Sequence, residues 1–126
     1  MRKFMIMSVL IVMVSVLASC TAAIDDSGDI GIRGTITSMT VSEDSDSALA
    51  TILVEGTPEE NTGLVSDKAS VTLTKDTVLV QGFEKKYLEL SDFDLLSAGK
   101  SVEVIFTGPV AESYPVQGDA KVVRLP

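Results

Sequence analysis

The stretch LSDFDLLSAGKSVEVIFT, residues 90–107, joins one short helix to one half-buried strand, and this combination decides the predicted fold. Ser91 is a preferred N-cap residue, Asp94 stands three positions later as in a weak capping box, and Gly99 is a helix stop. These signals predict one or two helical turns. From Ser101 onward apolar and polar side chains alternate, which is typical of a strand with one face toward a core.

The β-strand period continues through most of the chain outside this stretch. Apolar or alternating runs bounded by turn residues occur at 30–37, at 48–55, at 69–74, where the third strand resumes after Lys75-Asp76 at 77–80, and at 120–125. We expect a bend at Gly34, because glycine weakens a strand and lets another backbone come close. Residues 81–90 are left open as either a sixth strand or a mobile lobe. One short helix before the fourth of five strands predicts an all-β fold, a small OB-like barrel of five or six strands.

The chain begins with the signals of an exported lipoprotein. Arg2 and Lys3 precede an apolar run at residues 4–17, which is too short to predict a membrane span and is typical of a signal peptide. The tetrapeptide Leu-Ala-Ser-Cys at 17–20 resembles the lipobox of prokaryotic lipoproteins. That resemblance implies that Cys20 receives a diacylglyceryl group and becomes the new N-terminus, and a two-chain anchor of this kind holds a protein stably on its membrane.

These signals divide the chain into three parts. We expect residues 1–19 to be a lipoprotein signal peptide, residues 20–29 to be the lipidated cysteine with a flexible acidic tether, and residues 30–126 to be the barrel domain. The protein would then lie on the outer face of the cytoplasmic membrane or, in a diderm organism, on the outer membrane. The alternative is an ordinary secretory signal that leaves Cys20 as a free thiol. Cys20 is the only cysteine, so the fold is expected to be stable without an internal disulfide.

The charge of the chain limits its partners. The whole sequence has a net charge of −8, and loss of Arg2 and Lys3 with the leader leaves 8 basic and 18 acidic residues, a net charge of −10. A domain this acidic repels phosphate backbones and anionic headgroups. The second and third strands also lack the aromatic side chains on which OB barrels stack bases. We therefore expect no nucleic acid partner and no direct binding of anionic headgroups.

Several motifs occur in an order that resembles a known family. They are GIRGTI at 31–36, Lys-Asp-Thr at 75–77, SVEVIFTG at 101–108 and ESYPVQGDAKVV at 112–123. Their order resembles that of the YobA-like family of small secreted proteins and lipoproteins, a domain of unknown function. The resemblance implies an OB-like barrel and export, and it brings no catalytic residues with it.

The loop GPVAESYPVQGDAK, residues 108–121, is the candidate interaction site. Prolines, glycines and a tyrosine between two strands indicate either a corner or a recognition surface on a rigid scaffold. In the structural interpretation, Tyr114 packs on the barrel mouth and prolines stiffen the loop; a cis bond at Pro115 would make a tight corner. In the functional interpretation, the loop binds a partner, with residues 81–87 as a second contact. The candidate residues are Glu112, Ser113, Tyr114, Pro115 and Gln117.

Among the aromatic side chains, core positions are expected for Phe93 and Phe106, and surface positions for Phe83, Tyr87 and Tyr114.

The sequence offers little for catalysis or metal binding. It has no histidine, and no phosphate-binding loop or nucleophile elbow is present, so we expect no enzymatic activity and no cofactor. Asp44 and Asp46 in the acidic turn 43–47 are weak candidates for calcium. The EF-hand pattern fails there, because Leu49 stands where a glycine is required.

The leading hypothesis is a lipid-anchored, non-enzymatic module that binds an envelope or extracellular protein. The alternatives are a ligand or divalent-cation sensor and a purely structural envelope component.

Overall fold

A computed structural model describes residues 24–42 and 48–126 of the chain. The described strands and the single 3-10 helix follow in the order β1 Ile32–Val41, β2 Ala48–Glu55, β3 Lys68–Thr74, β4 Val78–Gln81, β5 Glu84–Tyr87, η1 Leu90–Leu96, β6 Ser101–Phe106 and β7 Val116–Leu125. The predicted leader, Cys20 and the candidate calcium ligands Asp44 and Asp46 lie outside the described residues. Among the described residues, no helix has the length and apolar character needed to cross a bilayer.

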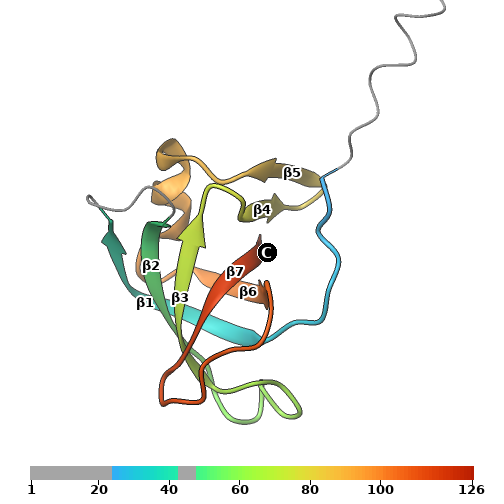
Figure 1. Cartoon of the computed structure of the whole chain (residues 1–126), viewed down its shortest axis with the longest axis vertical. Coiled ribbons are helices and arrows are strands. Elements are labelled where there is room, and N and C mark those ends of the chain that lie inside the picture. The colour runs from blue at the N-terminus through green and yellow to red at the C-terminus, as the bar shows by residue number, and fades with distance from the viewer. Residues whose placement is uncertain (1–23, 43–47) are drawn as a thin grey trace, which may run out of the picture.

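Five of the strands close a barrel (Figure 1). β1 pairs antiparallel with β2 and with β6, β2 pairs with β3, and β6 pairs with β7. The ring closes where β3 pairs in parallel with β7. Strand order and closure are those of a small OB-like barrel with one short helix, so the predicted fold is confirmed.

The barrel core comes from the inward-facing positions of the five strands. In β2 and β3 every second residue is buried, as their alternating sequences predicted. The helix closes one part of the core with Phe93 and Leu96. The larger fully buried aliphatic side chains of the strands in this core are Ile32, Ile36, Ile52, Val54, Val71, Leu73, Val104 and Val123.

Gly34 lies where β1 changes partner. Residues 32–35 pair with β6, and from Thr35 onward the strand pairs with β2. A Cβ at Gly34 would lie 2.5 Å from the carbonyl oxygen of Glu55, so only glycine fits at this close approach. This is the position at which the sequence indicated a bend.

β4 and β5 extend the barrel wall beyond β3. After the turn at residues 75–76, β4 pairs in parallel with the second half of β7, so β3 and β4 lie one after the other along the same strand. β5 folds back on β4 as a hairpin. Residues 81–90, which the sequence left open between a strand and a mobile lobe, therefore contain a strand, β5, at the edge of the sheet.

The helix begins two residues earlier than predicted. Its N-cap is Glu89 and its N3 residue is Asp92, so the assignment of Ser91 and Asp94 to these positions was wrong. The Asp92 carboxylate accepts the Glu89 N–H at 2.9 Å and the Lys86 ammonium at 3.0 Å. Asp92 has one more partner than local capping would give it, because β5 brings the Lys86 ammonium to its carboxylate. Capping preferences read from the local sequence cannot predict this contact with another strand.

Residues 24–31 form an arm that runs along the barrel (Figure 1). Ile24 and Ile30 pack on the small apolar cluster of Val78, Val80, Ile105 and Val122. Asp26 pairs with Lys85 at 3.0 Å. The sequence predicted a flexible acidic tether through residue 29, and the part from Ile24 onward is instead seated on the barrel.

Candidate functional site

The predicted interaction loop connects β6 to β7 at one end of the barrel. Backbone pairing of Ala111 with Gln117 closes the loop at its neck, where the Ala111 N–H donates to the Gln117 carbonyl at 2.8 Å. The Ser113 hydroxyl donates to the Pro115 carbonyl at 2.7 Å, and the Tyr114–Pro115 peptide bond is cis. The candidate loop residues are brought together at an ordered tip. Glu112, Ser113, Tyr114 and Gln117 are exposed, and Pro115 is half-buried.

Tyr114 is the most prominent side chain of this tip, with 70% of its surface exposed. Its hydroxyl donates to Asp67 Oδ1 at 3.2 Å. Desolvation and the Asp67 carboxylate raise the pKa of Tyr114, so the phenol remains a neutral donor at physiological pH. One contact at the hydroxyl holds a ring that is otherwise open to solvent.

An ion pair lies beside Tyr114 at the start of β3. Lys68 Nζ lies 3.0 Å from Glu55 Oε1 of β2. The hydrogen bond between them raises the pKa of Lys68 and lowers that of Glu55, so both groups remain charged at neutral pH. The tip therefore combines an aromatic ring with neighbouring charges of both signs.

The outer face of β2 and β3 continues from this ion pair toward β7. In successive rows, Leu53 pairs with Ser70 and Thr51 pairs with Thr72, and Ser70 and Thr72 pair in turn with Gln117 and Asp119 of β7. These six positions carry one aliphatic side chain, three hydroxyl groups, one amide and one carboxylate, and none of them is aromatic. The face can form hydrogen bonds, but it lacks the stacking platform of a barrel that binds single-stranded nucleic acid.

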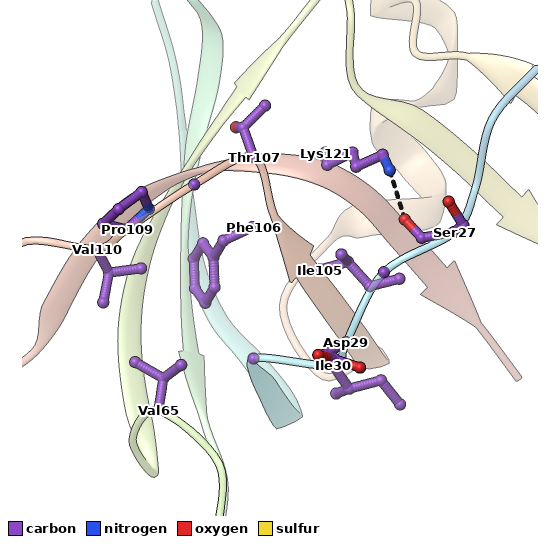
Figure 2. Close-up of a pocket in the computed structure, with 13 residues that line it drawn as sticks. Ser27, Asp29, Ile30, Val65, Ile105, Phe106, Thr107, Pro109, Val110 and Lys121 are labelled. Atoms are coloured by element: carbon purple, nitrogen blue, oxygen red, sulfur yellow. Dashed lines mark hydrogen bonds between the residues drawn. The ribbon is translucent and has the colours of Figure 1, made fainter.

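A groove of about 450 Å³ lies between the arm, the end of β6 and the base of the loop. Figure 2 shows Val65, Phe106 and Val110 converging from three segments, with Ser27 and Lys121 joined by a hydrogen bond at the far side. The lining is mixed, because the apolar side chains lie beside Ser27, Asp29, Thr107 and Lys121, so the groove offers both apolar and polar contacts.

The Phe106 ring fits between two glycines. A Cβ at Gly31 would lie 2.3 Å from the ring, and a Cβ at Gly118 would lie 2.9 Å from it. Phe106 is half-buried and packs on the main core, as expected, while Phe93 is buried. The groove wall is therefore continuous with the barrel core.

The second predicted contact region, residues 81–87, is the β4–β5 hairpin. Phe83 at its turn is fully exposed, and Tyr87 is about half exposed. β7 separates this hairpin from the loop, because Val116 at its start pairs with Ala69 while Leu125 at its end pairs with Gln81. A ten-residue strand spans about 30 Å. The two predicted contact regions thus lie at opposite ends of the barrel and form two separate surfaces.

Sequence reasoning missed Asp67 and Lys68 as neighbours of Tyr114. The OB-like topology could have indicated them, because it pairs β3 with β7 in parallel. Ala69 is opposite Val116, so the residues that stand two positions before each, Asp67 and Tyr114, also come together.

The described residues do not assemble a metal centre. Between residues 24–42 and 48–126, no group of three acidic, histidine or cysteine side chains could hold a metal ion. Buried side-chain polar atoms in the same ranges all have hydrogen-bond partners.

Fold and site together define a small OB-like barrel with an aromatic loop at one end and an aromatic hairpin at the other. The family model described as "Protein of unknown function (DUF3221)" matches residues 40–125, and the chain belongs to this family. A search of curated proteins and a search of solved structures found no match to the chain.

Proposed function

We propose that the protein is an exported lipoprotein, held by a diacylglyceryl group on Cys20, whose barrel is a non-enzymatic module that binds an envelope or extracellular protein. The lipobox at 17–20 and the resemblance to the YobA-like secreted proteins support export and anchoring. The anchored protein would lie outside the cytoplasmic membrane, on that membrane or on an outer membrane.

The observation that carries the binding role is the exposure of Tyr114 on an ordered loop. Interfaces are enriched in tyrosine, because its ring supplies contact area at little entropic cost and its hydroxyl can form a hydrogen bond. The loop is closed by backbone pairing and the hydroxyl is held by Asp67, so the ring does not have to be ordered when a partner binds. The neighbouring Lys68 and Glu55 offer charges of both signs for specificity.

The absence of enzymatic chemistry is proposed on compositional grounds. The sequence contains no histidine, and its one cysteine is assigned to the lipid. General acid–base and nucleophilic catalysis most often use these groups.

The experiment is capture of partners from detergent-solubilised envelopes by the full-length protein. Wild type is expected to retain a partner that Tyr114→Ala loses. Phe83→Ala is the matched control, because it also removes an exposed aromatic ring but lies at the other end of the barrel, and it should retain the partner. If Tyr114→Ala retains every partner of the wild type, the loop is not the binding surface.

The alternative of ligand or cation sensing has one structural observation in its favour. The groove beside Phe106 has a volume of about 450 Å³, which is in the range of small-molecule sites. For cations, the candidate ligands Asp44 and Asp46 lie outside the described residues. A purely structural envelope component would use neither the loop nor the groove.

A further inference from the structure

The β4–β5 hairpin presents its aromatic side chains to solvent at the outer edge of the sheet. Phe83 stands at the turn, beside Gly82 with its positive φ of 63°, and is fully exposed. Tyr87, about half exposed, has the same strand parity as Phe83 and Lys85. The hairpin thus carries an aromatic–lysine–aromatic pattern along one side of β5, which is the outermost of the described strands.

The described arm begins at this hairpin. Ile24 packs against the cluster that contains Val78 and Val80 of β4. Asp26 pairs with Lys85, which is two residues after Phe83. Figure 1 shows the start of the arm beside the turn between β4 and β5. The point at which the chain leaves the described barrel toward Cys20 is therefore next to Phe83.

The reach of the remaining chain is short. Cys20 is four residues before Ile24, and four residues span at most about 14 Å however they run. This inference rests on the proposed lipid anchor at Cys20. If Cys20 carries the lipid, the bilayer surface lies within about 14 Å of Ile24, the first residue of the arm. The β4–β5 hairpin is an exposed surface that contacts the arm, whereas the Tyr114 loop lies at the far end of β7.

We propose that the β4–β5 hairpin is the membrane-facing surface of the anchored protein, with the Phe83 ring inserted at the boundary between headgroups and acyl chains. Aromatic side chains are enriched at this depth of a bilayer. In this orientation the Tyr114 loop faces away from the membrane, toward partners.

A bilayer suits the hairpin better than a protein partner does. A stable protein interface covers about 800 Å² on each partner. The hairpin offers two separated rings with charged residues between them, and its lysines are already paired with Asp26 and Asp92. One inserted ring beside a covalent lipid needs no such area, because the anchor supplies the affinity and the ring supplies only orientation.

The chain contains no tryptophan, so one substitution creates a fluorescent reporter at a chosen position. The test uses the full-length lipidated protein in phosphatidylcholine vesicles, with and without bromine on the acyl chains. Phe83→Trp is expected to shift its emission to the blue and to lose most of its intensity in brominated vesicles. Tyr114→Trp, the control at the other end, is expected to show neither change. Neither side chain is buried, so both variants should fold.

Each outcome decides a separate claim. If the protein floats with the vesicles and Phe83→Trp is not quenched, the hairpin is not in the membrane while the anchor stands. Equal quenching of both reporters would mean that the barrel has no fixed orientation, which also overturns the proposal. If the wild-type protein carries no lipid and does not float, the anchor fails and the proposed orientation fails with it.

Discussion

Thr77 stabilises the point where the wall of the barrel passes from β3 to β4. Its side chain is fully buried. Its hydroxyl accepts the Thr74 N–H at 2.9 Å and donates to the Ala120 carbonyl of β7 at 2.8 Å. The turn at residues 75–76 interrupts the pairing of the sheet, and this hydroxyl supplies hydrogen bonds to backbone groups at the break.

Replacing Thr77 with valine keeps the shape of the side chain and removes both hydrogen bonds. Because backbone groups would lose their partners in a buried place, we expect Thr77→Val to lower the free energy of unfolding by about 1–3 kcal/mol. Thr77→Ser keeps the hydroxyl and loses one methyl group, at a cost of about 1 kcal/mol or less. Urea unfolding followed by circular dichroism measures both. A Thr77→Val protein as stable as the wild type would contradict this role.

The burial of single side chains could be predicted from the sequence, whereas their long-range hydrogen bonds could not. The core positions of Phe93 and Phe106 follow from strand and helix periodicity, and the exposure of Phe83, Tyr87 and Tyr114 follows from their position in turns and at an edge. The role of Thr77 could not be predicted, because its acceptor is 43 residues away on β7. Such a hydrogen bond forms only because the barrel closes and brings distant strands together, and a local sequence pattern does not show which strands will be neighbours.

At the scale of elements, the arm is the part that departs most from expectation. Its composition is small and acidic, which is typical of a tether. The basic side chains that pair with it, Lys85, Lys121 and Arg124, come from β5 and β7, at least 59 residues later in the sequence. A flexible tether and a seated arm have the same local sequence pattern, and only long-range contacts, both ion pairs and the packing of Ile24 and Ile30, distinguish them.

The seating of the arm is expected to respond to acid. The Ser27 hydroxyl and N–H, and then Lys121, lower the pKa of Asp25 from 3.8 to about 2. A lowered pKa in the folded state means that the stabilisation is complete above pH 3.8 and is lost as the pH falls toward 2. Asp25 is exposed, so the effect on global stability is expected to be small and the local titration is the better measurement.

Carbon-13 NMR of the Asp25 carboxyl group follows this titration directly. Its midpoint is expected at about pH 2 in the wild type, and Ser27→Ala should move it upward toward 3.8 because the largest cause of the shift is removed. A wild-type midpoint at the ordinary value of 3.8 would show that the arm does not hold this carboxylate.

At the scale of the whole molecule, the barrel could be predicted because its strands alternate clearly and its helix stands before the fourth strand of the ring. The parallel closure of β3 on β7 then explains the contacts that the sequence did not indicate, Tyr114 with Asp67 and Thr77 with Ala120. The same strand, β7, separates the Tyr114 loop from the Phe83 hairpin. The protein has a membrane end and a partner end only if Cys20 carries the lipid.

Intact mass and membrane fractionation of the native protein, beside Cys20→Ala, test that claim most directly. We expect the wild type to lack residues 1–19, to carry the mass of a diacylglyceryl group on Cys20 and to be found with the membranes. The Cys20→Ala protein should be left unprocessed or be released. A wild-type protein that is soluble and unlipidated would contradict the anchored module, and with it the assignment of the two ends.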